Sequence, residues 1–202
     1  MNQIFPSCGG VARSAGVVLA SASPRRIELT RRIGLDCVID PADIDESVNE
    51  PAEDAAAVLS LRKAAAVAER HPAGTIIIAA DTLVVCNEEL LGKPNNEKEA
   101  FSMLRSLAGR THTVKTGVTV MRDGQTLVKT ESTQVTMREL TDAEILAYIA
   151  TGEPMDKAGA YGIQERGALL VERVEGDFYN VMGLPVCLLA KMLAHFGIDL
   201  LC

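Results

Sequence analysis

One acidic residue interrupts a long apolar segment of the chain. Asp81 directly follows the run TIIIAA at 75–80 and directly precedes the run TLVV at 82–85. Burying a carboxylate costs on the order of several kcal/mol unless it meets a cation, a metal or several hydrogen-bond donors. Asp81 could be a structural residue bonded to backbone amides. We expect it at the end of a central strand, where α/β proteins commonly place their functional sites, and this position favours a chemical role.

A basic segment follows the first apolar run of the chain. The residues ASPRR at 22–26 come directly after VVLA at 17–20, and Ser23-Pro24 suits the N-cap and first turn of a helix. Backbone amides at a helix N-terminus attract anions, and Arg25 and Arg26 would strengthen that attraction. A solvated pair of surface arginines is at least as common, so this segment alone is a weak indication of an anion site.

The segment 40–54 contains seven carboxylates and no basic residue. They are Asp40, Asp43, Asp45, Glu46, Glu50, Glu53 and Asp54. From the sequence alone we favour the interpretation that this is a solvated acidic loop. The alternative is that one or two of these carboxylates hold a hard divalent cation.

Two lysines are candidate partners for anionic groups. Lys63 lies in an Ala-rich stretch at 51–71 that predicts a helix, four residues from apolar neighbours on either side. Because the stretch is so rich in Ala, the spacing does not decide whether Lys63 or Arg62 points inward. Lys93 lies in the tight segment LGKP at 91–94. Either lysine could equally be an ordinary surface residue.

The elements that must position these residues alternate in type, which predicts an α/β protein. Strands are expected at 17–21, 37–39, 75–80, 111–120 and 125–137, and short strands separated by glycines at 159–174. Helices are expected at 23–34, 51–71, 95–107, 141–149 and 184–196. The run at 75–80 is typical of a strand covered on both faces, and Asp123-Gly124 is a strong hairpin signal. We expect one domain at 17–202, preceded by a flexible extension at 1–16.

Composition excludes several classes of protein. The chain has 202 residues, 48% of them hydrophobic, and a net charge of −7, which argues against binding a nucleic acid polymer but permits a small phosphorylated substrate. No apolar stretch approaches the roughly 20 residues that span a bilayer, so we expect no membrane contact. The five cysteines form no CxxC pair, which favours reduced thiols in the cytoplasm over disulfides or structural zinc.

Several familiar catalytic signatures are absent from the sequence. There is no GxxxxGK[ST] loop and no GxGxxG fingerprint, so neither a P-loop NTPase nor a Rossmann dehydrogenase is indicated. A nucleophile elbow is also missing, and the three histidines lack HExxH spacing. A haloacid-dehalogenase-type phosphatase would need a second Asp two positions after Asp81, where Leu83 stands, and we discard it.

Seven stretches, taken in order, resemble the motifs of the Maf family. They are LASASPRR at 19–26, Asp45-Glu46, the helix around Lys63, AADT at 79–82, GKP at 92–94, DKAGAYGIQ at 156–164 and VMGLP at 181–185. One such motif would be a weak signal, whereas seven in the right order are highly specific. The resemblance runs from about Val17 to the last predicted helix.

The resemblance implies a mixed, twisted sheet flanked by helices, with two lobes around a nucleotide-binding cleft, as in Maf and ITPase-like folds. It also implies hydrolysis of nucleoside triphosphates between the α- and β-phosphates with Mg²⁺ or Mn²⁺, and it makes a homodimer plausible. Arg25, Thr82 and Gln164 look like the branch that acts on dTTP and UTP. The other main branch, which prefers methylated GTP, usually differs at these positions.

The resemblance also implies roles for individual side chains. Asp81 would be the general base that activates water, and Glu46 with Asp81 would hold the metal. Lys63 and Lys93 would stabilise the transition state and the leaving pyrophosphate. The remaining candidates would bind substrate: Ser23 and Arg26 with the phosphates, and Arg25, Thr82 and Gln164 with the base.

Two other functions remain open from the sequence. One is a house-cleaning pyrophosphatase for purine or modified nucleotides, which Arg25 and Gln164 make less favoured. The other is a nucleotide-binding regulator of cell division or septum formation in which turnover is incidental. The complete set of Glu46, Lys63 and Asp81 with Lys93 argues against a purely non-catalytic role.

Overall fold

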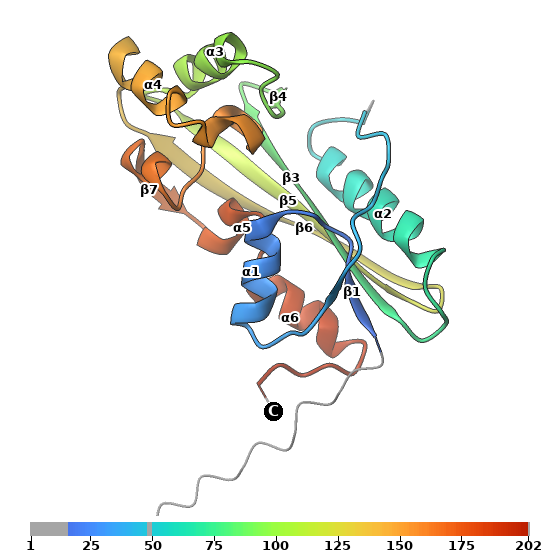
Figure 1. The fold of residues 1–202 in the computed structure, drawn as a ribbon. Coiled ribbons are helices and arrows are strands. Elements are labelled where there is room, and N and C mark those ends of the chain that lie inside the picture. Colours follow the sequence, from blue (N-terminus) through green and yellow to red (C-terminus); the bar gives the residue numbers. More distant parts are fainter. Residues whose placement is uncertain (1–15, 48–49, 202) are drawn as a thin grey trace, which may run out of the picture.

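The computed structural model describes residues 16–47 and 50–201, which form one mixed seven-stranded sheet flanked by helices (Figure 1). The strands are β1 (Val17–Leu19), β2 (Val38–Ile39), β3 (Ile76–Cys86), β4 (Glu89–Leu91), β5 (Thr111–Arg122), β6 (Gln125–Met137) and β7 (Val171–Glu175). Their order is β2-β1-β3-β5-β6-β7, with β4 also paired to β3. β1 is parallel to β2 and β3, and the other pairs are antiparallel. The expected mixed α/β sheet is confirmed.

Helices cover both faces of this sheet. Those of the described residues are α1 (Pro24–Arg32), α2 (Ala55–Ala68), α3 (Glu97–Leu107), α4 (Asp142–Ile149), α5 (Phe178–Met182) and α6 (Val186–Ala194), with 3₁₀ helices η1 (Glu153–Asp156), η2 (Ala158–Ala160) and η3 (Arg166–Leu169). Alternate side chains of β3 face opposite layers. Ile77 and Ala79 pack against α2, whereas Ile78 and Ala80 pack in the core that includes α1 and α6. The prediction of a strand covered on both faces is therefore confirmed.

A separate core forms the other end of the molecule. There α3 and α4 pack on the distal halves of β3, β5 and β6, with Val84, Val114 and Val135 fully buried between them. Figure 1 shows α3 and α4 at one end of the sheet and α1, α2 and α6 at the other. This division agrees with the two lobes expected around a cleft.

The sheet is interrupted along one edge of β3. β1 pairs with β3 at residues 76–78, and β4 pairs with the same edge at 84–86. β5 covers the opposite edge at residues 77–85. No strand in the described part of the chain therefore covers 79–83 on the β1 side, where the chain leaves β1 and turns into α1. Asp81 lies in the middle of this interruption.

Two sequence-based expectations about strands are wrong. Asp81 does not end its strand, because β3 continues to Cys86 with β5 on one edge and β4 on the other. The segment 159–174 does not form several short strands, since it contains most of η2, all of η3 and a single strand, β7, which ends one residue later. Gly159 and Ala160 have φ values of 69° and 58°, in the left-handed region that strands exclude.

The predicted hairpin is confirmed. β5 and β6 pair along their whole length and are joined at Asp123-Gly124, where φ is 49° and 81°. Positive φ at both central residues is the requirement of a type I′ turn. The predicted helix at 51–71 is shorter in the structure and begins only at Ala55. Apart from Gly16, the expected extension at 1–16 lies outside the described residues.

None of the helices formed by the described residues combines the length and the apolar character needed to cross a membrane.

A glycine sets the distance between α2 and the sheet. A Cβ atom built on Gly117 would lie 2.1 Å from the carbonyl oxygen of Ala56 and 2.6 Å from the backbone nitrogen of Ala57, both in α2. Gly117 is also the register partner of Asp81 across β3 and β5. The missing side chain thus lets the backbone of α2 lie directly on the sheet at the level of Asp81.

We expect Gly117→Ala to destabilise the protein, because either α2 or β5 must move to relieve a backbone clash. Overpacking costs about 1–3 kcal/mol or more, so the melting temperature should fall by at least about 2 °C and by about 10 °C at the upper end of this range. Gly92→Ala is the matched control, since a Cβ atom at that position meets nothing within 4 Å. Differential scanning calorimetry of the two variants checks this, and an unchanged melting temperature in Gly117→Ala would contradict the close packing.

Candidate active site

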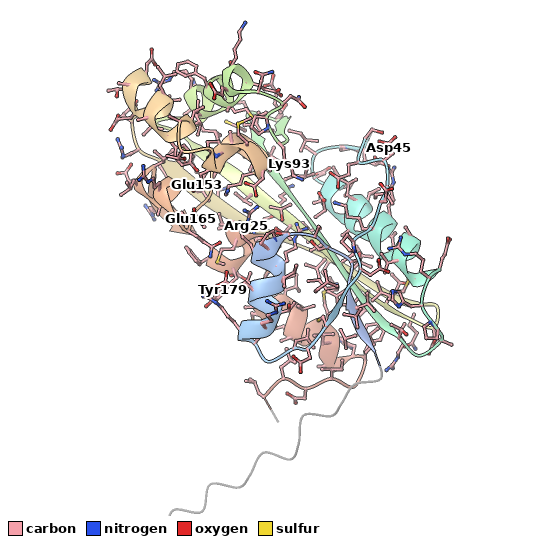
Figure 2. All side chains as sticks on the ribbon, viewed as in Figure 1. Arg25, Asp45, Lys93, Glu153, Glu165 and Tyr179 are labelled. Atoms are coloured by element: carbon pink, nitrogen blue, oxygen red, sulfur yellow. The ribbon has the colours of Figure 1, made fainter. Side chains whose placement is uncertain are left out.

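A cleft of about 600 Å³ lies beside the interruption in the sheet. Ligand sites for small molecules typically measure about 300–1,000 Å³. Its walls come from the β1–α1 turn, the acidic segment, α2, the middle of β3, the turn after β4 and the segment 156–164. All nine residues singled out from the sequence line it: Ser23, Arg25, Arg26, Glu46, Lys63, Asp81, Thr82, Lys93 and Gln164. In Figure 2, Arg25, Lys93 and Glu153 come from separate segments near the middle of the view.

Lys63 joins two carboxylates in this cleft. Its Nζ donates a hydrogen bond to Asp81 Oδ1 and lies 2.7 Å from Glu46 Oε1. Lys63 and Asp81 are only 8% and 7% exposed, so each needs the other to offset its loss of hydration. A buried carboxylate at the position of Asp81 needs a cation nearby, and Lys63 is that cation.

The structure resolves which basic residue of α2 points inward. Lys63 projects between the helix and the sheet, whereas Arg62 is exposed and donates to Glu50 Oε1 at 2.9 Å and to the Ser47 carbonyl oxygen at 2.9 Å. Because α2 is so rich in Ala, the sequence could not distinguish the inward residue from the outward one. The two adjacent cations thus have different environments, one in the cleft and one on the surface.

The cleft keeps Glu46 ionised at neutral pH. The hydrogen bond from Lys63 lowers the pKa of Glu46 below its ordinary value; partial burial opposes this, and the charges of Lys63, Lys93 and Arg26 lower the pKa further. These cations come from three elements. All three line the same cleft as Glu46, and such a gathering of cations is the electrostatic requirement for holding a polyanion.

The other described carboxylates of the acidic segment do not share this environment. Asp40 forms a bidentate pair with Arg70, and Glu50 pairs with Arg62, so α2 and the residues after it hold the segment at two points. Asp45 hydrogen-bonds within its own loop. The interpretation as a solvated acidic loop therefore describes most of the segment but not Glu46.

Two groups in the cleft present hydrogen-bond donors for an anion. Ser23 is the N-cap residue of α1 and lines the cleft, but its side chain makes no capping hydrogen bond, so the hydroxyl and the first amides of α1 are not paired with each other. Lys93 is exposed and forms no salt bridge with any residue that the structure describes. These donors line the same cleft as the Asp81 carboxylate.

Arg26 has a different environment from the one expected for a phosphate ligand. All three of its guanidinium nitrogens donate to the protein: Nε to the Gly183 carbonyl oxygen at 2.8 Å, Nη1 to Ser21 Oγ at 3.3 Å and Nη2 to Thr82 Oγ1 at 3.0 Å. Burial lowers its pKa and the nearby Asp81 carboxylate opposes that shift. We therefore interpret Arg26 as a clamp that joins α1, β3 and the end of α5.

Residues that were not predicted from the sequence form and support the wall at 156–164. Asp156 accepts hydrogen bonds from Arg25 Nη1 at 3.4 Å and from Lys157 Nζ at 2.7 Å, which connects the two lobes across the cleft. Glu153 accepts hydrogen bonds from the Tyr148 hydroxyl and from the backbone of 166–167. Asp156 lies within a stretch of the family resemblance, whereas nothing in the local pattern marks Glu153.

The remaining candidates lie at the sides of the cleft. Thr82 is half-buried and directly follows Asp81, so its side chain points to the opposite face of β3, toward α1 and α5. Gln164 is exposed in the segment between η2 and η3. The structure thus brings Glu46, Lys63 and Asp81 into contact, while Gln164 makes none of these contacts.

The carboxylates of the cleft fit a divalent cation whose coordination is completed by the substrate. Among the described residues, no group of three or more His, Cys, Asp or Glu side chains could enclose a metal ion. Mg²⁺, however, commonly uses only one or two carboxylates together with substrate phosphates and water. Glu46 and Asp81 are two such carboxylates, and both contact the same atom, Lys63 Nζ. The residues therefore fit this mode of binding.

This chain is similar over most of its length to several proteins that share one name. A protein of Moorella thermoacetica named dTTP/UTP pyrophosphatase is 54% identical over 91% of this chain and 96% of its own. Proteins with the same name in Caldicellulosiruptor saccharolyticus and Dictyoglomus thermophilum are 48% and 46% identical, over 92% of this chain and 96% and 98% of theirs.

The family model described as Maf-like protein matches residues 16–196. The match includes all seven stretches on which the resemblance was based, from the β1–α1 turn to the end of α5. Because it spans nearly all of the 202 residues, the chain belongs to the Maf family.

Proposed function

We propose that this protein is a nucleoside triphosphate pyrophosphatase that hydrolyses dTTP and UTP to the monophosphate and pyrophosphate. The observation on which the proposal depends is the buried Asp81, paired with Lys63, in a cleft with cations around its rim. The names of its relatives, which are up to 54% identical in the matches described above, supply the substrate class. The volume of the cleft is suited to a nucleotide.

Asp81 is the group best placed to activate water. In this mechanism it takes a proton from a water molecule, whose oxygen attacks the α-phosphorus. The bond between that phosphorus and the oxygen bridging to the β-phosphorus breaks, and pyrophosphate leaves with the electron pair. Lys63 orients the carboxylate by its hydrogen bond to Oδ1 and places a positive charge beside it. Burial strengthens this control, because little water competes for either group.

The cations of the cleft stabilise the charge that develops on the phosphates. Lys93, without a salt-bridge partner among the described residues, is free to bind the leaving pyrophosphate, and the amides at the start of α1 with Ser23 bind the remaining oxygens. Lys63 contributes its charge at the centre of the cleft. Without these cations, a carboxylate base and a triphosphate would repel each other.

Glu46 and Asp81 would hold a divalent cation, Mg²⁺ or Mn²⁺, together with phosphate oxygens. When bound, the cation would neutralise charge on those oxygens. Arg25, Thr82 and Gln164 would contact the base from α1, β3 and the segment after η2. We place the protein in the cytoplasm, consistent with Cys37, Cys86 and Cys187 all being free thiols.

Asp81→Asn should lower turnover of dTTP by roughly 10²- to 10⁴-fold, the contribution typical of a general base. The amide preserves the shape of the side chain, so dTTP binding measured by calorimetry should be largely retained. Asp45→Asn is the matched control, because Asp45 is exposed and bonded only within its loop. Unchanged turnover in Asp81→Asn would remove this residue from its role.

Lys63→Met and Arg62→Met form a second matched pair on adjacent residues of α2. The first removes the charge from the cleft and should lower turnover by about 100-fold or more. The second removes an exposed ion pair with Glu50, worth about 0–1 kcal/mol of stability, and the hydrogen bond to the Ser47 carbonyl oxygen, both outside the cleft, and should leave turnover within about threefold of the wild type. Steady-state pyrophosphate release measures both. Equal losses in the two variants would contradict the orientation of α2.

A panel of nucleotides tests the substrate class, and removal of the metal tests the metal requirement. Pyrophosphate release should be highest with dTTP and UTP, lower with ITP and methylated GTP, and abolished by EDTA. Glu46→Gln should raise the Mg²⁺ concentration that gives half-maximal activity by about tenfold, whereas Asp45→Asn should leave it unchanged. Full activity in EDTA would refute the metal requirement, and activity on purine nucleotides alone would refute the substrate class.

A further inference from the structure

Four groups form a continuous hydrogen-bonded chain beneath the cleft. Arg26 Nη2 lies 3.0 Å from Thr82 Oγ1, Thr82 Oγ1 lies 2.9 Å from Thr116 Oγ1, and Thr116 Oγ1 lies 3.1 Å from the backbone carbonyl oxygen of Asn180. Thr82 and Thr116 are also register partners on β3 and β5. Thr116 is fully buried, whereas Thr82 is half-buried and lines the cleft. The chain thus connects one cleft residue to the interior.

The two ends of this chain determine the direction of every hydrogen bond in it. A guanidinium nitrogen can only donate, and a backbone carbonyl oxygen can only accept. Thr116 has a single hydroxyl hydrogen, which must lie between Thr116 Oγ1 and the Asn180 oxygen, since two oxygens 3.1 Å apart would otherwise repel. Thr116 Oγ1 is then an acceptor toward Thr82. The hydrogen between the two threonines therefore belongs to Thr82.

This direction leaves Thr82 with one way to meet a ligand. Its hydroxyl hydrogen points to Thr116, and one lone pair accepts from Arg26. Only the other lone pair remains, so toward the cleft Thr82 is a hydrogen-bond acceptor and not a donor. A free threonine hydroxyl would adapt by rotation to either kind of partner.

We propose that Thr116 is a positioning residue that makes this cleft select bases carrying an N–H on the edge that meets Thr82. The inference rests on the proposed function. Thymine and uracil carry a hydrogen on N3, which the lone pair of Thr82 would accept. Cytosine has a bare nitrogen lone pair at N3 and would face a second acceptor. Since both thymine and uracil present this N–H, one fixed acceptor serves dTTP and UTP alike.

The same chemistry extends to purines and supplies an independent comparison. Hypoxanthine carries a hydrogen on N1, whereas adenine has a bare lone pair there. The two pairs, UTP with CTP and ITP with ATP, therefore differ in the same respect on different ring systems. An acceptor in the cleft favours the first member of each pair.

The test compares Thr116→Val, Thr116→Ser and Thr119→Val with the wild type on these four nucleotides, using kcat/KM for pyrophosphate release. Thr116→Val removes the acceptor for the Thr82 hydrogen but leaves the Asn180 oxygen bonded to the Gly183 amide. Thr116→Ser restores the hydroxyl. Thr119→Val is the matched control, because it removes a buried hydroxyl from the same strand that is bonded to Ser60 on the opposite face.

In Thr116→Val the Thr82 hydroxyl can turn toward the cleft and donate to a bare nitrogen. The ratio of kcat/KM for UTP over CTP should therefore fall by about tenfold or more, the scale set by exchanging a matched for a mismatched polar contact. Thr116→Ser and Thr119→Val should keep the wild-type ratio. A simple loss of stability would lower all four activities together and would not change the ratio.

Each other outcome has a definite meaning. A wild-type ratio in active Thr116→Val overturns the role of Thr116 while leaving the proposed function intact. If Thr116→Val does not fold, Thr116→Ser decides, because a tenfold change of the ratio in a variant that keeps the hydroxyl also overturns it. If the wild-type protein cleaves ITP in preference to ATP but does not cleave UTP, the proposed substrate is refuted. The ratio of kcat/KM for ITP over ATP in the variants then tests the role of Thr116. Wild-type cleavage of none of the four overturns both.

Discussion

The ion pair between Lys63 and Asp81 is the constraint on which the rest of the structure depends. A carboxylate in the middle of a buried strand is unstable without a cation, and a lysine on an otherwise Ala-rich helix is unstable without an anion. The pair requires α2 to lie directly on the sheet, and Gly117 permits this by leaving no side chain between them. The contact that joins α2 to the sheet thus also positions the carboxylate that we propose as the general base.

The site exists because the sheet is incomplete at one place. β1 ends after three residues and β4 begins farther along β3, so no strand in the described ranges 16–47 and 50–201 pairs with 79–83 on that edge. The turn into α1 fills part of that opening and brings Ser23 and Arg25 beside Asp81. A strand that continued past Leu19 would close the sheet and remove the cleft.

Much of the fold and the membership of the site could be predicted from the sequence, but their geometry could not. Periodicity and turn residues were sufficient for β3 and for the β5–β6 hairpin, because both signals are local. The extension of β3 past Asp81 depends on pairing with β4 and β5, which no local pattern encodes. Likewise Ala neighbours left the inward residue of α2 undecided, and the bonds of Arg26 to Gly183 and Thr82 could not be predicted because these acceptors are distant in sequence.

The ion pairs around the acidic segment that carries Glu46 differ in their exposure to solvent. Ionic strength therefore weakens some of them more than others. The Arg70–Asp40 and Arg62–Glu50 pairs are partly exposed, so dissolved ions weaken them at ordinary concentrations. The Lys63–Asp81 pair is buried and is screened much less. Rising salt therefore weakens the contacts that support Glu46 before it weakens the contact between Lys63 and Asp81. In the proposed function, salt would then lower the affinity for the metal before it affects the activation of water.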